Sequence, residues 1–238
     1  MKKKKFKILA VTLARGGSKG IKNKNIIKIL GKPLIEYTID QALKSKLITH
    51  YLVSTDSKKI QKLVNKRGNY APFLRPKKLS QSKSKAVDAD KHALKWAEKH
   101  FQIKFDYFVE LMVTNPMKTH IDIDNVLTKI IKTNADSVIG VSELEDHHPL
   151  RIKKIVGDRI CNFNNTLKEI PETQRQQLKP KAYIRNGSIY ASKRDLLIEG
   201  IRYGTKNSRP YIMKADNSVN IDTKNDLVLA EILLRKRK

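Results

Sequence analysis

The first glycine-rich stretch of the chain has the residue types that bind a polyphosphate. A continuous apolar run, residues 8–14, ends abruptly at Arg15-Gly16-Gly17-Ser18-Lys19-Gly20. Glycines permit backbone angles closed to other residues and let amide groups come close to a ligand. A hydroxyl and several cations accompany them, on Ser18, Arg15, Lys19, Lys22 and Lys24. The spacing fits neither the P-loop nor the dinucleotide-binding fingerprint. We predict a phosphate-binding loop, with an ordinary strand-to-loop turn as the alternative.

The elements that must position this loop alternate between strand and helix. Apolar runs predict strands at residues 8–14, 51–54, 71–74, 107–112 and 137–142, and helical spacing predicts helices near 33–43, 57–67, 86–100 and 121–133. Such alternation is typical of an α/β fold, with a mostly parallel sheet covered by helices on both faces, which makes three layers. The loop then lies at the carboxyl end of a parallel strand, where α/β proteins bind ligands.

The pattern changes after residue 142. Two short apolar runs, 152–156 and 159–163, flank Gly157-Asp158 and predict a hairpin. A polar stretch, 164–181, and a strand at 182–191 follow, and the chain closes with a strand near 210–213 and a helix from about 224 to 234. We therefore expect one domain over residues 1–238, with an inserted lid or dimerisation segment at about 143–187.

Composition limits the classes of function. The 238 residues, 39% of them hydrophobic, can bury a full core, and the lone Cys161 excludes a disulfide within the chain and a cysteine metal site. Fifty Lys and Arg against 23 Asp and Glu give a net charge of +27, which suits anionic substrates, nucleic acid or a membrane surface. Aromatic residues are only 6% and scattered, unlike a nucleic-acid-binding face. With no apolar run of about 18 residues, we expect a soluble, cytoplasmic protein that binds no membrane and no specific nucleic acid.

Several motifs resemble the acylneuraminate cytidylyltransferases, the CMP-sialic acid synthetases. In the order of that family they are residues 14–20 with 24–25, 53–56, 74–76, 116–118, 146–151, 175–178, 186–190 and 221–222. The resemblance implies a nucleotide-diphospho-sugar transferase fold and a homodimer whose inserted segment reaches the partner's site. It also implies the reaction of CTP with a 2-keto-3-deoxy sugar acid to give the CMP-sugar and pyrophosphate.

The resemblance also implies roles for particular residues. Those matching the nucleotide-binding positions are Arg15, Ser18, Lys19, Lys24, Asn25, Arg75 and Ser84. Those matching the sugar-binding positions are Arg151, Arg175, Arg185 and Asn186, and the catalytic set is Arg15, Lys24 and Asp222, with Asp222 on Mg²⁺. Arginine suits the carboxylate of a sugar acid because it binds bidentately. The alternative for Arg75 is a surface arginine after a strand. At the position matched by Arg185, many family members carry their arginine one residue earlier, where this chain has Ile184.

Two departures from the family concern the metal and the sugar. The family's closing Asp-x-Asp is Asn220-Ile221-Asp222 here, which leaves one carboxylate for magnesium. Met112 stands where the family often has Gln or Asp, and Glu110 points to the same strand face. Glu110 either faces the sugar, or helps the metal through water, or lies at the wet end of the sheet. His147 and His148 read as loop residues rather than metal ligands.

The sequence therefore predicts a magnesium-dependent cytidylyltransferase that charges a sugar acid of the sialic, legionaminic or pseudaminic type for surface glycans. One alternative is a nucleotidylyltransferase for 3-deoxy-octulosonate or a sugar-1-phosphate, although the usual G-x-G-T-R loop of the latter is absent. A basic nucleic-acid-binding module is the other alternative.

Overall fold

A six-stranded sheet forms the centre of the protein. The computed structural model describes residues 5–18, 20–144, 147–164 and 174–237. The strand order is β10-β6-β9-β5-β1-β4. In chain order the strands are β1 (Ile8–Leu13), β4 (His50–Ser54), β5 (Tyr107–Leu111), β6 (Ser137–Glu143), β9 (Tyr183–Lys193) and β10 (Ser208–Ile212).

The sheet is mostly parallel, as the alternation predicts, with β9 as the exception. Strand β1 runs parallel to β4 and β5, and β10 runs parallel to β6. Strand β9 lies antiparallel between β5 and β6. The chain leaves β6 at the carboxyl edge, forms the inserted segment there and returns from that edge. Strand β9 must therefore run opposite to β6.

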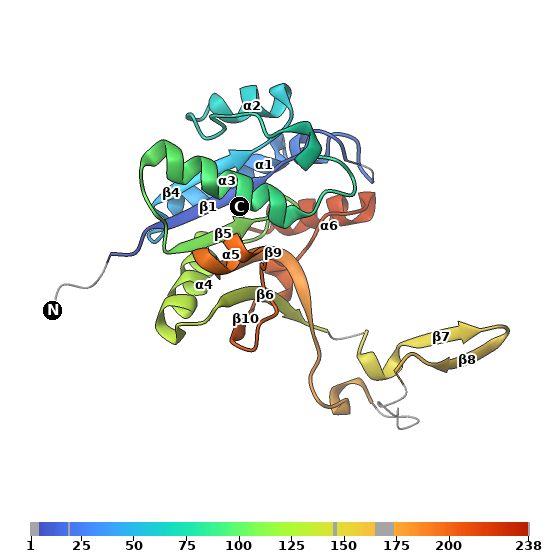
Figure 1. Cartoon of the computed structure of the whole chain (residues 1–238). Helices are drawn as coiled ribbons and strands as arrows, with labels where there is room; N and C mark the ends of the chain where they lie inside the picture. The colour runs from blue at the N-terminus through green and yellow to red at the C-terminus, as the bar shows by residue number, and fades with distance from the viewer. Residues whose placement is uncertain (1–4, 19, 145–146, 165–173, 238) are drawn as a thin grey trace.

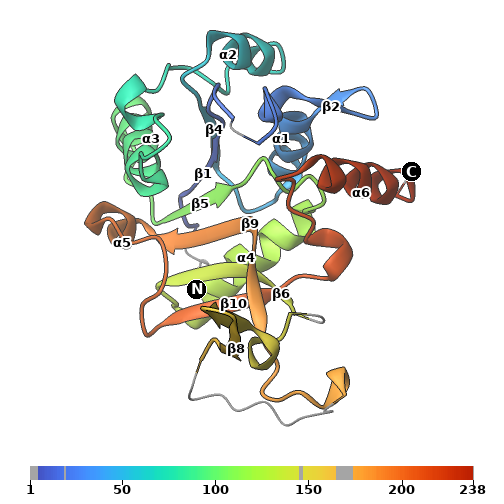
Figure 2. The same cartoon turned by 90° about the vertical axis from the view of Figure 1, so that its right-hand side faces the viewer.

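Helices cover both faces of the sheet and complete the three layers (Figures 1 and 2). One face packs against α1 (Leu34–Lys44), α2 (Lys58–Asn65), α4 (His120–Thr133) and α6 (Lys224–Arg235), and the other against α3 (Ala86–Phe101) and α5 (Arg194–Glu199). Along β1, Ile8 and Ala10 face the first group while Leu9 and Val11 face the second. Burial on both faces explains why this strand is a continuous apolar run.

The predicted strand at residues 71–74 is wrong. Only Leu74 forms an isolated bridge there, to Thr55. Pro72 has no N–H to donate to a ladder, and side chains of α2 take the neighbouring backbone groups. Asn65 accepts from the Ala71 N–H at 2.8 Å and donates to the Ala71 carbonyl at 3.1 Å. A short hairpin, β2 (Lys28–Ile29) with β3 (Lys32–Pro33), and helix α5 were not predicted.

The predicted hairpin after residue 142 is confirmed. Strands β7 (Lys153–Val156) and β8 (Arg159–Asn162) pair antiparallel, and Figure 1 shows them projecting away from the sheet. Ile155 and Ile160 are 78% and 76% exposed. Residues 165–173 of the polar stretch lie outside the described residues. The hairpin therefore presents apolar side chains that the described part of this chain leaves uncovered.

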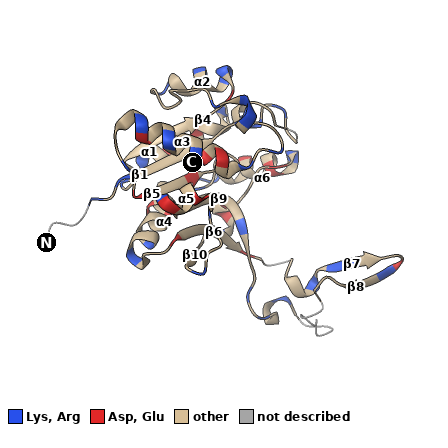
Figure 3. Ribbon diagram, viewed as in Figure 1, with Lys and Arg blue, Asp and Glu red and all other residues tan. Residues whose placement is uncertain are grey.

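The basic residues are dispersed. Figure 3 shows Lys and Arg on helices, loops and the projecting hairpin alike. Within the described ranges, no helix is both long and apolar enough to cross a membrane.

Candidate active site

A cavity of about 650 Å³ opens at the carboxyl ends of β1 and β5. Its walls come from the loop after β1, the stretch leading into α3, the end of β5 and the segment before α6. The residues predicted from the sequence that line it are Arg15, Ser18, Lys24, Asn25, Arg75, Ser84 and Asp222, together with Glu110, Met112 and Asn220. Lys19 lies outside the described residues. The folded chain thus gathers most of the nucleotide-binding set at one edge of the sheet.

Two side chains hold the loop after β1 in place through hydrogen bonds to backbone groups of the loop. The Gly16 N–H donates to Asp56 Oδ1 at 2.8 Å, and Asn25 Nδ2 donates to the Arg15 carbonyl at 2.9 Å. Gly16 and Gly17 lie outside the left-handed φ region. Gly20 packs so closely against the Asp222 backbone that a Cβ there would lie 2.9 Å from the Asp222 carbonyl oxygen.

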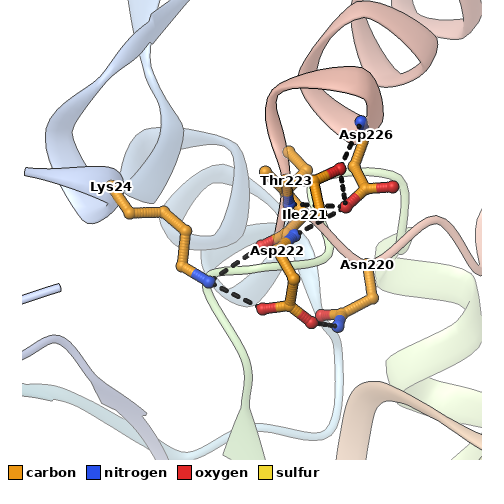
Figure 4. A network of polar contacts seen from close by, with 6 residues as sticks. All are labelled: Lys24, Asn220, Ile221, Asp222, Thr223 and Asp226. Atoms are coloured by element: carbon orange, nitrogen blue, oxygen red, sulfur yellow. Dashed lines mark hydrogen bonds and ion pairs between the residues drawn. The ribbon is translucent and has the colours of Figure 1, made fainter. Parts of the chain in front are cut away.

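Lys24 joins this loop to the far end of the chain (Figure 4). Its Nζ is 2.8 Å from Asp222 Oδ1 and 2.9 Å from the Ile221 carbonyl oxygen. Asn220 Nδ2 donates to the other carboxylate oxygen of Asp222 at 2.5 Å. The Asp222 side chain is 65% exposed, whereas that of Lys24 is 16% exposed. A carboxylate is therefore presented on the cavity rim with its position fixed from two sides.

The start of α6 fixes the backbone of the same segment. Thr223 and Asp226 form a capping box, and the Asp222 N–H also donates to Asp226 Oδ2 at 2.9 Å. The Ile221 N–H donates to the Thr114 carbonyl at 2.8 Å, and Ile221 is fully buried. The capping residues thus start α6 directly after Asp222, which lines the cavity.

Arg75 is a buried cation in the cavity wall rather than a solvated surface arginine. It is 5% exposed, and its Nε donates to Ser80 Oγ at 2.9 Å. Burial lowers the pKa of Arg75, and the nearby carboxylates of Asp56 and Asp90 oppose that shift. Ser84 Oγ donates to the Lys78 carbonyl at 2.8 Å and so fixes the turn before α3.

The predicted sugar-binding residues are not among the described residues that line this cavity. Arg151 and Arg175 are exposed in the inserted segment, and Arg175 borders a separate hollow beside His148. Arg185 donates to the hydroxyl of Tyr203, and its guanidinium carbon lies 4.9 Å from the centroid of that ring. Asn186 is buried and donates to Ser218 Oγ at 3.0 Å. The structure therefore separates the two predicted sets within one chain.

His148 is bonded within the inserted segment. His148 is buried, its Nε2 lies 2.8 Å from the Pro180 carbonyl oxygen, and its Nδ1 accepts from the Leu150 N–H. No group of three or more His, Cys, Asp or Glu residues in the described ranges could hold a metal ion. His148 braces the base of the inserted segment instead.

The sequence analysis assigned no role to two cations next to the cavity, the partly buried Arg202 and the fully buried Lys118. Arg202, in the loop after α5, forms an ion pair with Glu110. The fully buried Lys118 donates to the Met112 carbonyl at 2.6 Å and to Thr38 Oγ1 at 3.0 Å, and burial lowers its pKa to about 7. Glu110 in an apolar strand was the available signal for Arg202, since a buried carboxylate needs a cationic partner.

Cations gathered at the carboxyl edge of a mostly parallel sheet with helices on both faces are typical of α/β proteins that bind nucleotides. Residues 9–234 match the family described as cytidylyltransferase. The chain belongs to this family.

Two relatives match nearly the whole chain. Post-translational flagellin modification protein B of Campylobacter coli is 32% identical, over 97% of this chain and 96% of its own. CMP-N,N'-diacetyllegionaminic acid synthase of Campylobacter jejuni is also 32% identical, over 95% and 94%. Among solved structures, a CMP:2-keto-3-deoxy-manno-octonic acid synthetase complexed with CTP aligns with a TM-score of 0.71, covering 98% of this chain and all of the other at 20% identity. That likeness confirms the fold.

The contact at Gly20 gives a prediction with a matched control. Gly20→Ala should lower cytidylyltransferase activity by roughly ten- to a hundredfold, because the new Cβ would push the loop away from the Asp222 backbone. Gly17→Ala should keep activity close to wild type, since nothing lies within 4 Å of its Cβ position. Pyrophosphate release from CTP measures both. Equal activity of the two variants would show that the loop and the Asp222 segment need not touch.

Proposed function

We propose that this protein transfers CMP from CTP to a nine-carbon 2-keto-3-deoxy sugar acid of the sialic, legionaminic or pseudaminic type, and releases pyrophosphate. The observation behind this proposal is the cavity in which Arg15, Lys24 and Arg75 surround the space next to the Asp222 carboxylate. Membership of the cytidylyltransferase family and the relative named for legionaminic acid support the choice of substrates. The product would supply surface glycan synthesis. Because the reaction uses CTP, we place it in the cytoplasm.

To catalyse this reaction, the protein must mainly position the two substrates and stabilise negative charge. The anomeric hydroxyl of the sugar acid attacks the α-phosphorus in line, the bond to the β-phosphate oxygen breaks, and pyrophosphate leaves. Arg15 and Lys24 would hold the phosphates, with Ser18 and Lys19 beside them, while Asn25 braces the Arg15 carbonyl. Fixed cations stabilise the charge that develops on the leaving group without having to rearrange.

The residues around Asp222 fit a magnesium ion that arrives with CTP. The Asp222 carboxylate is exposed on the cavity rim, and Asn220 Oδ1 is a buried oxygen without a hydrogen-bond partner among the described residues. Magnesium prefers oxygen ligands and takes few from proteins when phosphates supply the rest. Asp222, with Asn220 beside it, would hold the ion, which would neutralise charge on the triphosphate. Glu110 is engaged by Arg202 and is not part of this set.

The sugar end of the site would be completed by a second copy of the chain. Arg151 and Arg175 belong to the inserted segment, and the adjoining hairpin exposes apolar side chains. We propose a homodimer of single-domain subunits in which this segment, about residues 143–187, reaches the partner's cavity. Arg185 and Asn186 precede Gly187, which lines the cavity of their own chain, so they would meet the sugar from that side.

An assay with a panel of acceptors tests the reaction. The protein should release pyrophosphate from CTP only when a nine-carbon keto-deoxy acid is supplied, and the panel should include 3-deoxy-octulosonate and sugar-1-phosphates. Arg15→Ala should lower kcat/KM about a hundredfold, since a charge-assisted contact contributes about 1.5–3 kcal/mol and more in the transition state. The exposed Arg235→Ala serves as the control. Turnover with none of the nine-carbon acids would refute the proposal.

The metal site gives a separate prediction. Asn220→Asp should lower the magnesium concentration needed for half-maximal rate several-fold, because it adds a charged oxygen ligand next to Asp222. Asp222→Asn should nearly abolish turnover while the thermal unfolding temperature stays close to wild type, because the side chain is largely exposed. Magnesium titrations of both variants measure the effect. Normal activity and normal magnesium dependence of Asp222→Asn would place the metal elsewhere.

Shared sites can be detected by mixing inactive variants. Arg15→Ala and Arg175→Ala subunits should together recover part of the activity, since a mixed dimer contains one intact site if each site uses both chains. Mixing Arg15→Ala with Lys24→Ala is the matched control and should recover none, because both residues line the same cavity. Subunit exchange is verified with differently tagged chains. No recovery in the first mixture would assign Arg175 to the site of its own chain.

A further inference from the structure

A group of buried and partly buried charges adjoins the cavity through Glu110, and the proposed mechanism does not use it. Glu110, on β5, lines the cavity and is 2% exposed. Asp90, on α3, is fully buried. Arg202 reaches both carboxylates from the loop after α5, through an ion pair of its Nη2 with Glu110 Oε2 and a distance of 3.3 Å from its Nε to Asp90 Oδ2. One guanidinium thus serves two carboxylates.

Aromatic rings hold this guanidinium in place. Its central carbon lies 5.1 Å from the centroid of Tyr190, on β9, and 5.8 Å from that of Tyr203. The two rings stack on one another with their centroids 5.5 Å apart. Cation–π contacts with both rings therefore hold the Arg202 guanidinium between β9 and its own loop.

The place of Glu110 distinguishes this group from an ordinary structural ion pair. Glu110 and Phe108 share one face of β5, which packs under α3 and α5, and Glu110 is the position of that face that borders the cavity. The partly buried pair of Arg194 with Glu98 also links α5 to α3, yet neither residue is among those that line the cavity. Arg194 and Glu98 are the natural comparison for a role in stability alone.

We propose that Arg202 is a positioning residue which keeps the Glu110 carboxylate ionised and fixed at the cavity floor, and that Glu110 determines acceptor specificity. This inference rests on the proposed function. A polyhydroxylated sugar acid offers hydroxyl and N–H donors, which a fixed carboxylate accepts as charge-assisted hydrogen bonds. The same carboxylate repels the acid group of the sugar. It therefore orients the acceptor with its own carboxylate away from β5.

The groups facing Glu110 set the direction of its pH dependence. They are Asp90 from α3, Arg202 and Tyr203 from the loop after α5, and Tyr190 opposite on β9, while β1 contributes only the apolar Val11 and Leu13. Burial raises the pKa of Asp90, and Arg202 and Arg75 oppose that shift. Without Arg202, the desolvated carboxylates of Asp90 and Glu110 lose the cation they share, which disfavours their ionised forms. Because the ionised form binds the acceptor, activity is lost at low pH and regained as pH rises.

The experiment measures kcat/KM for the sugar acid against pH, at saturating CTP, with the acceptor that the wild-type protein uses best. Arg202→Met should move the acid limb of this profile to higher pH by about one unit or more and raise KM for the sugar acid at least about fivefold at pH 7. KM for CTP should change less than about twofold, and Arg202→Lys should restore most of the wild-type profile. Arg194→Met, the control, should lower the unfolding temperature without moving the limb.

Glu110→Gln decides the outcome if Arg202→Met does not fold. This variant leaves Arg202 paired with Asp90, and it should raise KM for the sugar acid at least about fivefold while removing the acid limb due to Glu110. An unmoved limb in Arg202→Met, or an unchanged sugar KM in Glu110→Gln, would overturn the inference. Neither of these two outcomes would contradict the proposed function. The proposed function fails only if the wild-type protein uses no sugar acid of the class.

Discussion

The contact between Lys24 and the segment 221–222 is the one on which the site depends. It joins residues 198 positions apart in the sequence. Because Ile221 is buried and its N–H donates to the Thr114 carbonyl in the turn after β5, Lys24 also fixes the loop after β1 relative to that turn. Three separate parts of the chain meet there at one edge of the sheet. The cavity exists because these parts are bonded to one another, and not because any one of them forms it alone.

Charge is buried around the cavity to an extent that a structural core does not require. Arg75, Asp90 and Glu110 are nearly or fully inaccessible to solvent, as is Lys118 behind the turn after β5. Desolvating an ion is expensive unless partners compensate, and each of these groups has an opposite charge or a set of carbonyl acceptors nearby. These desolvated charges are concentrated at one edge of the sheet. Cations and a carboxylate are thereby held in fixed positions, as their proposed contacts with the substrates require.

The inserted segment divides the predicted site into two parts. The residues expected to bind nucleotide lie in the body of the chain, close to the sheet. Arg151 and Arg175 lie beyond the carboxyl edge, on a segment whose hairpin projects outward with apolar side chains exposed. The residues proposed to bind the acceptor thus lie on a projecting segment, whereas those proposed to bind nucleotide are built into the fold.

The sequence by itself determined the alternating α/β order, the loop after β1, the hairpin around Gly157 and the start of α6. Each of these follows from apolar periodicity, turn residues or caps within a few neighbouring positions. The tertiary structure alone decided the antiparallel direction of β9, the absence of a strand at residues 71–74, the burial of Asn186 and the pairing of Glu110 with Arg202. These features depend on contacts between residues that are distant in the sequence. Such contacts produce no periodic pattern in the sequence around either residue.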